Sequence, residues 1–130
     1  MRMLGPVLDA ADPVALARFY EALLGWEMTE CEGPRDGFPP NDGWARLRSP
    51  DHVHKLEFQW EQHYARPEWP IRPGAPQMSI HLDIQCDDLD AGVALAVSLG
   101  ATVADPQPQG HDFHVIVLDP EGHPFCLCRA

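Results

Sequence analysis

One order of expected elements occurs twice along the chain, and this internal repeat constrains the fold more than any other feature. Each copy reads as a strand, a helix and three further strands. An aspartate stands at the expected N-cap of each helix (Asp12 and Asp88), and a glycine stands at each helix end (Gly25 and Gly100). A repeat of this length indicates two structural modules, although few residues are identical between the copies. The alternative is an ordinary α+β domain that contains two similar helices.

Both expected helices carry a single apolar stripe, which is typical of helices that cover one face of a sheet. In the first helix, which Pro13 opens, apolar side chains recur at the spacing of one helical face: Leu16, Phe19, Tyr20, Leu23 and Leu24. In the second helix the stripe consists of Leu89, Val93, Ala96 and Leu99. The two stripes predict one core between each helix and its sheet.

Strand-like runs complete the two modules. The expected strands are 3–10, 26–31, 44–48 and 55–60 in the first copy, and 78–86, 102–104, 113–118 and 124–129 in the second. A Pro-rich linker over 61–77 separates a first module, 1–60, from a second module, 78–130. The sequence therefore predicts an α+β fold, with a single domain over 1–130 built from two tandem βαβββ modules.

The net charge and the composition of the chain exclude some classes of binding partner. The chain has 130 residues with nine basic and twenty acidic side chains, which gives a formal net charge of −11. A surface this acidic repels phosphate backbones and anionic lipids, so we expect neither a nucleic acid nor a membrane as partner. No apolar run is long enough to span a bilayer. The four cysteines show no Cys-x-x-Cys spacing, which favours a cytoplasmic protein.

Four segments together resemble the vicinal oxygen chelate superfamily. They are Phe-Tyr-Glu-Ala-Leu-Leu-Gly-Trp at the end of 12–26, Leu-Glu-Phe-Gln at 56–59, His-Leu-Asp-Ile at the start of 81–89, and Asp-Pro-Glu-Gly at the start of 119–126. That superfamily includes glyoxalase I, bleomycin-resistance proteins and extradiol dioxygenases, and the chain is most similar to its small glyoxalase-like branch. The resemblance implies curled mixed sheets around a central cleft that binds a small molecule, in a protein that forms a homodimer.

The resemblance also implies a metal site, because the superfamily's enzymes place ligands on strands that face the cleft. His81 and Glu57 match two ligand positions, so they are the expected metal ligands and lead catalytic residues. Gly5, at a third position, has no ligand atom, and Cys126 stands where the enzymes often carry Glu. A full four-ligand metal site is therefore not present. The binding of a divalent metal (Zn, Ni, Mn or Fe) by fewer ligands stays an open alternative. The alternative makes His81 a hydrogen-bonded polar residue, Glu57 a solvated one and Cys126 a buried thiol.

Further residues are expected to face the cleft. His114 is a candidate general base, with a surface histidine as the alternative. Trp44 and Trp60 could stack on a planar ligand or pack in the core. Gln59 and Cys126 are further candidate ligand-binding residues.

Other polar segments carry weaker signals. His52 and His54 follow a proline at a turn and are expected to be solvated. His111 and His114 straddle a loop and the start of a strand. The loop 33–43, rich in proline and glycine, is expected to be either a lid or plain surface.

These observations favour a glyoxalase-like small-molecule-binding protein with lyase, isomerase or related activity, which uses a degenerate metal site or metal-free acid–base chemistry. The alternative is a non-catalytic, ligand-sequestering protein of the bleomycin-resistance type. In that alternative the acidic surface attracts a cationic ligand, and Trp44 and Trp60 stack on it. A third hypothesis is an interaction domain whose cleft is vestigial.

Overall fold

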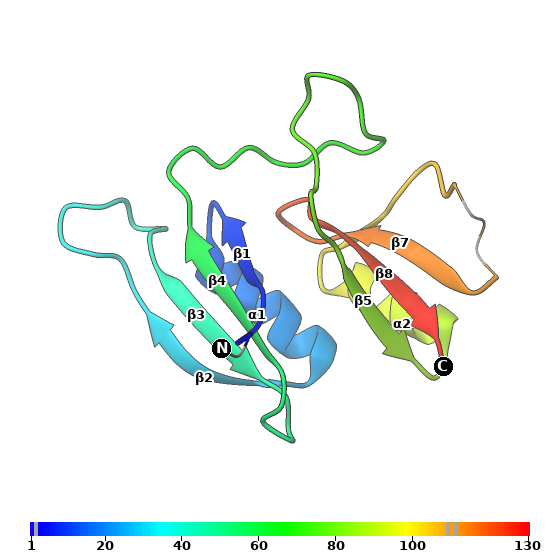
Figure 1. The fold of residues 1–130 in the computed structure, drawn as a ribbon, viewed down its shortest axis with the longest axis horizontal. Helices are drawn as coiled ribbons and strands as arrows, with labels where there is room; N and C mark the ends of the chain where they lie inside the picture. The colour runs from blue at the N-terminus through cyan, green and yellow to red at the C-terminus, as the bar shows by residue number, and fades with distance from the viewer. Residues whose placement is uncertain (2, 109, 111) are drawn as a thin grey trace. The chain divides into compact units, whose positions relative to one another are not determined.

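The computed structural model of the chain describes residues 1, 3–108, 110 and 112–130, and these divide into two compact units. The first unit is Met1–Tyr64 and the second is Ala65–Ala130. Each unit contains one helix and one four-stranded mixed sheet. Figure 1 traces the chain through the two units. This arrangement confirms the α+β fold class and the two tandem βαβββ modules that the repeat predicts.

The first unit has a sheet in which one outer strand runs parallel to its neighbour. Its elements are β1 (Val7–Ala10), α1 (Pro13–Leu24), β2 (Glu27–Glu32), β3 (Trp44–Arg48) and β4 (Lys55–Trp60). The strand order is β1-β4-β3-β2, with β1 parallel to β4 and the other pairs antiparallel. The chain therefore crosses over between β1 and β4, while β2, β3 and β4 follow one another.

The second unit repeats this topology. Its elements are β5 (Leu82–Cys86), α2 (Leu89–Ser98), β6 (Thr102–Val103), β7 (His114–Leu118) and β8 (Pro124–Arg129). The strand order is β5-β8-β7-β6, with β5 parallel to β8 and the other pairs antiparallel. The duplication seen in the sequence is therefore a duplication of strand order and strand direction as well.

Helix α1 begins and ends where its capping residues predict. The Asp12 carboxylate accepts a hydrogen bond from the Ala15 amide at 3.0 Å, and Gly25 takes a left-handed conformation with φ of 64°. The buried ring of Tyr20 packs against Phe58 of β4, with ring centroids 5.6 Å apart. Helix α1 thus covers one face of its sheet, and we call the opposite face the helix-free face (Figure 1).

Helix α2 has the same N-cap and a different end. The Asp88 carboxylate accepts from the Ala91 amide at 3.0 Å. The helix ends at Ser98 with Leu99 as its right-handed C-cap, and the expected terminator Gly100 follows with φ of 108°. Its contacts run to β6, β7 and β8, so α2 also leaves its sheet with one helix-free face.

Two strands begin four residues later than the sequence predicts. The strand expected over 3–10 begins at Val7, because Gly5 has a φ of 144° and Pro6 follows it. The strand expected over 78–86 begins at Leu82, because its partner β8 begins only at Pro124, which has no amide hydrogen to extend the ladder. His81 therefore stands immediately before a strand rather than within one.

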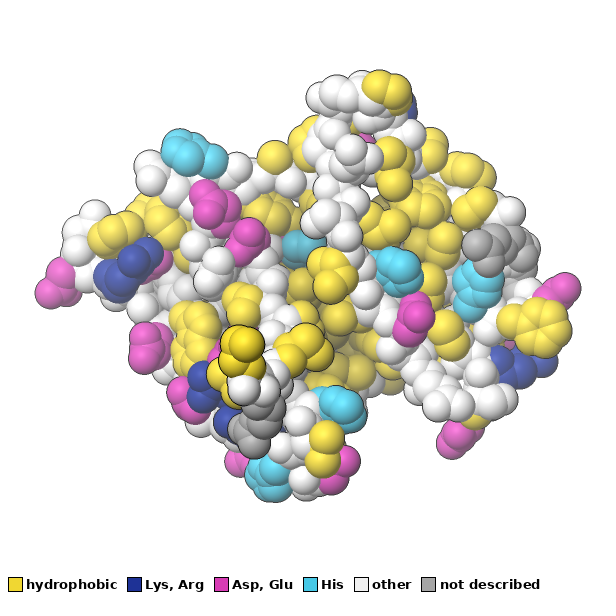
Figure 2. Space-filling model, viewed as in Figure 1, with side chains coloured by type: hydrophobic (Ala, Val, Ile, Leu, Met, Phe, Trp, Pro, Cys, Tyr) yellow, Lys and Arg dark blue, Asp and Glu magenta, His cyan; other side chains and the backbone are white. Residues whose placement is uncertain are grey.

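Figure 2 shows acidic side chains scattered over the face in view, with few lysines or arginines among them, as the net charge of −11 requires. Among the described residues, no helix has the length and hydropathy needed to cross a lipid bilayer.

Candidate functional site

The helix-free face of the first sheet is charged, because the strand register brings several ionic side chains together there. Arg46 of β3 lies opposite Glu57 of β4, and Arg48 lies opposite Lys55. Directly opposed residues point to the same side of a sheet. The four side chains therefore form one charged group on the face that α1 does not cover.

Glu57 binds two of these cations at once. Arg46 Nε donates to its Oε1 atom at 2.6 Å, and Lys55 Nζ donates to its Oε2 atom at 2.7 Å. Arg46 also pairs with Glu30 of β2. Burial by itself raises the pKa of Glu57, but the hydrogen bonds from Lys55 and Arg46 outweigh it and leave that pKa below its usual value. Glu57 is thus an ionised carboxylate whose two oxygens both hold cations.

This geometry differs from the metal-ligand role expected for Glu57. A guanidinium and an ammonium already neutralise this carboxylate, which weakens its attraction for a metal cation. Gly5 stands at the other ligand position that the resemblance implies for the first unit, and it has no side-chain donor atom. The described residues of the first unit therefore provide an ion-pair network at the place where the resemblance implies half of a metal site.

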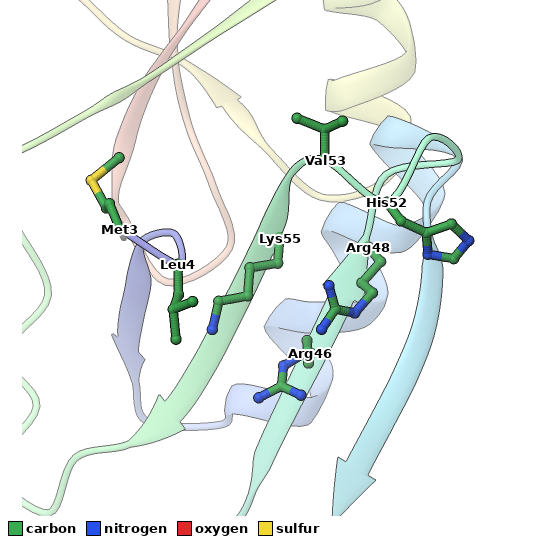
Figure 3. Close-up of a pocket in the computed structure, with 7 residues that line it drawn as sticks. All are labelled: Met3, Leu4, Arg46, Arg48, His52, Val53 and Lys55. Atoms are coloured by element: carbon green, nitrogen blue, oxygen red, sulfur yellow. The ribbon is translucent and has the colours of Figure 1, made fainter. Parts of the chain in front are cut away.

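A cavity of about 640 Å³ opens beside this network (Figure 3). Its charged lining consists of Arg46 and Arg48 from β3 and Lys55 from β4, and His52 of the preceding turn also lines it. Its apolar lining consists of Met3, Leu4 and Val53. No acidic side chain belongs to this lining among the described residues.

The sequence analysis did not identify Arg46, Arg48 and Lys55 as functional residues. The available signal was the alternation in β3, where Ala45 and Leu47 are fully buried and the arginines between them must face the other way. Strand register, which places Lys55 opposite Arg48, is not readable from that alternation alone.

Three of the expected ligand-binding residues meet at a second, smaller cavity of the first unit. Trp44, Gln59 and Trp60 line this cavity of about 240 Å³. Gln59 donates its side-chain amide to Asp9 Oδ1 at 2.7 Å, and the Arg46 guanidinium carbon lies 4.8 Å from the centre of the Trp44 ring. One face of Trp44 is therefore already occupied by a cation of the protein.

The loop 33–43 is held in place by an ion pair and an aromatic contact. Arg35 donates its backbone amide and its Nε to Asp42 Oδ2 at 2.7 and 3.0 Å, and its Nη2 to Oδ1 at 2.7 Å. The Phe38 ring packs edge-on against Trp60, with centroids 5.8 Å apart. The hydrogen bonds from Arg35 lower the pKa of the buried Asp42 carboxylate. The loop is thus an ordered cover over Trp60.

The second unit brings together three residues with metal-binding side chains. His81, Asp83 and Cys126 each offer one ligand atom, and these atoms lie within 4.8 Å of one another. His81 Nε2 is 3.4 Å from Asp83 Oδ1, and Asp83 of β5 lies opposite Cys126 of β8. The structure therefore joins His81 and Cys126, both expected at the site, to Asp83, which was not among the expected site residues.

The Cys126 thiol is protonated near neutral pH in this setting. Burial, with the charge of Asp83 as a further cause, raises the pKa of Cys126 to about 11. A metal that binds this sulfur must therefore displace a proton, since the thiolate is the form that coordinates.

His114 lies on the same helix-free face of the second sheet. It opens β7 opposite Cys128 of β8, and Cys126 stands two positions away along that strand. His114 is half-buried and is not a member of the His81, Asp83 and Cys126 group. His111, its expected partner in sequence, lies outside the described residues.

These two units, with their matched topology, define a member of the vicinal oxygen chelate superfamily. A family model described as a glyoxalase-like domain matches residues 6–128. The chain therefore belongs to the glyoxalase-like domain family. The search of curated proteins found no match.

Solved structures with the same fold include antibiotic-resistance and glyoxalase-family proteins. The fosfomycin resistance protein FosX from Mesorhizobium loti is 13% identical, with a TM-score of 0.68 over 99% of this chain and 91% of that one. A glyoxalase family protein from Enterococcus faecalis is 21% identical, with a TM-score of 0.66 over 98% and 97%. A mutant of FosX from Listeria monocytogenes, complexed with Mn(II) and 1S,2S-dihydroxypropylphosphonic acid, is 11% identical, with a TM-score of 0.71 over 99% and 92%. At these identities the likeness concerns the fold.

Proposed function

We propose that this protein is a small-molecule-binding glyoxalase-like enzyme of the lyase or isomerase type, with a divalent metal held by His81, Asp83 and Cys126. The observation that carries the proposal is the convergence of three different donor groups within 4.8 Å on the second unit. The metal-bound FosX structure adds support, because it shows that this fold accommodates a divalent ion in another protein.

The side chains of His81, Asp83 and Cys126 are suitable ligands for a divalent metal ion. Imidazole, carboxylate and thiolate are all ligands of zinc, and a catalytic zinc site uses three protein ligands and keeps one position open. A thiolate favours zinc or iron over manganese, which prefers oxygen donors. A metal bound here would supply Lewis-acid polarisation of substrate oxygens.

The protein's own residues have distinct parts in this proposal. His81 and Asp83 are exposed and can reach an incoming ion without rearrangement of the core, while half-buried Cys126 releases its proton to bind. His114, on the same helix-free face, is placed to accept a proton from a bound substrate. Glu57 is left out of the metal set because both of its oxygens hold cations.

Elemental analysis of the purified, untagged protein tests the metal. It is measured after exposure to Zn, Ni, Mn or Fe(II), in the wild type, in His81→Ala and in the matched control His63→Ala, whose histidine is exposed and lies in the first unit. We expect about one ion per chain in the wild type and the control, and loss of that ion in His81→Ala. Absence of metal from the wild type, or equal content in all three proteins, would contradict the proposal.

The second candidate is a non-catalytic ligand-sequestering protein. The small cavity lined by Trp44, Gln59 and Trp60 favours it, because two indoles and an amide can hold a planar ligand without any metal. Under this alternative the protein binds its ligand unchanged and contains no metal, so the same elemental analysis separates the two candidates.

A further inference from the structure

The 640 Å³ cavity of the first unit concentrates positive charge in an acidic protein. Three of the nine basic residues of the chain, Arg46, Arg48 and Lys55, line this one cavity, although the chain carries a net charge of −11. The lining has no acidic member among the residues that the structure describes, although Glu57 and Glu30 contact two of its cations.

The strand register places like charges side by side, and their repulsion destabilises the sheet unless counter-charges compensate it. Arg48 and Lys55 lie directly opposite each other on β3 and β4, and like charges in that position destabilise a sheet. Glu57 and Glu30 pair with Arg46 and Lys55. Arg48 has no ion pair within the described part of the chain. Glu27 of β2 stands opposite Arg48 in the strand register, so this face carries three cations and three carboxylates. Arg48 is the lining cation that no described carboxylate binds.

The apolar lining indicates what else the occupant carries. Met3 is 91%, Leu4 60% and Val53 69% exposed beside the cations. Figure 3 shows Leu4 beside the end of the Lys55 side chain. A molecule that fills this cavity therefore needs an anionic head for Arg48 and Lys55 and a short apolar body for the other wall, and the cavity volume is in the range of small-ligand pockets.

Gly5 allows the segment before β1, which carries Met3 and Leu4, to lie close to β4. A Cβ atom at this position would lie 2.6 Å from the Lys55 carbonyl oxygen and 2.9 Å from Lys55 Cγ, and φ is 144°. Only glycine allows the chain to pass this close to β4. Gly5 thus lets the segment that carries Met3 and Leu4 pass beside β4, where both residues line the cavity with Lys55.

We propose that this cavity binds a small organic anion, with a carboxylate or phosphoryl-type head on Arg48 and Lys55 and an apolar body against Met3, Leu4 and Val53. Guanidinium groups bind both heads through paired, charge-assisted hydrogen bonds. The inference deepens the proposed small-molecule function by naming the substrate class, and it does not depend on the metal.

Titrations of the 130-residue protein with butyrate, butylphosphonate and butanol, followed by NMR, test the site. We expect both anions to bind and to shift the resonances of Arg48 and Lys55, while butanol does not bind. The relative affinities of the two anions distinguish a carboxylate from a phosphoryl ligand. Butanol binding as tightly as butyrate, or no binding of either anion, would overturn the proposal.

Variants then locate the anion. Arg48→Gln should weaken binding about tenfold because it removes one charge-assisted contact, and Arg48→Lys should retain most of the affinity. Arg18→Gln is the matched control, since Arg18 is 62% exposed and pairs with Glu21 on α1. Equal affinity in Arg48→Gln and the wild type, with the fold of both checked by their amide spectra, would reject the site.

The same titration in His81→Ala separates this proposal from the metal proposal. Anion binding retained in a variant that has lost its metal would support the cavity independently. Metal retained in Arg48→Gln together with lost anion binding would support both sites. Loss of anion binding in His81→Ala but not in Arg48→Gln would place the anion on the second unit and overturn the inference.

Discussion

Lys55 Nζ lies 2.7 Å from Glu57 Oε2, and each of the two side chains is only 9% exposed. Arg46 occupies the other carboxylate oxygen of Glu57 at 2.6 Å. A buried carboxylate between two cations compensates charges that would otherwise be costly in a poorly solvated place. Glu57 therefore holds two of the three cations that line the cavity, Lys55 and Arg46, and its negative charge is compensated within the sheet.

Glu57→Gln should destabilise the protein strongly. The amide keeps the shape of the side chain but leaves Lys55, whose side chain is 9% exposed, without its counter-charge, which costs about 3 kcal/mol of unfolding free energy. Arg46 keeps its pair with Glu30. Urea unfolding at neutral pH measures this change. Glu68→Gln is the control, because Glu68 pairs with Arg72 across an exposed surface, where such pairs contribute about 0.5 kcal/mol. Equal stability of the two variants would show that Glu57 is not a buried counter-ion.

Gly5→Ala should lower stability and anion affinity together. The added Cβ would approach the Lys55 carbonyl oxygen at 2.6 Å and would stand on a backbone with φ of 144°, so the segment before β1 must move away. Strain of this kind costs about 1–3 kcal/mol. Gly33→Ala is the matched control, since a Cβ there meets nothing within 4 Å. Urea unfolding and butyrate titration report the two effects, and an unchanged Gly5→Ala protein would contradict the close approach.

Much of the fold was predictable because its signals are local. The N-caps Asp12 and Asp88 and the apolar stripes lie within single helices, so they need no knowledge of the sheet. The late start of β5 was not predictable in this way. It depends on Pro124, 42 residues from Leu82 by the numbering, which ends the ladder from the partner strand.

The candidate site was predictable only in part, for the same reason. His81 and Cys126 were identified through the resemblance, whereas Asp83 was not among the expected site residues. Alternation along β4 places Lys55 on the face of Glu57, two residues away. The second partner, Arg46, depends on the register of β3 against β4, which the turn between those strands sets.

Acidification should release the loop 33–43. The hydrogen bonds from Arg35 lower the pKa of Asp42 in the folded protein, so their stabilisation is fully present above the ordinary aspartate pKa of about 4 and is lost as pH falls through the lowered folded value. The Arg35 amide, which donates to Asp42 Oδ2, should therefore lose hydrogen-exchange protection at low pH.

The matched reference for this prediction is the Trp60 amide, which donates to the Gly43 carbonyl, a group that does not titrate. Protection factors of both amides are compared across the acidic range, and Asp42→Asn should remove the pH dependence at Arg35. Parallel loss at both amides would mean that the whole unit unfolds and that the ion pair does not control the loop.

Metal uptake should depend on pH through Cys126. Burial raises the pKa of this thiol to about 11, so below that value the sulfur must release one proton for each ion bound. Zinc affinity should then rise about tenfold per pH unit between roughly pH 7.5 and 9.5, as measured by competition with a chelator of known affinity. In Cys126→Ser the affinity should fall and the dependence should flatten, whereas the exposed Cys31→Ser control should keep the wild-type slope. An unchanged slope in Cys126→Ser would remove the sulfur from the donor set and leave His81 and Asp83 as an incomplete site.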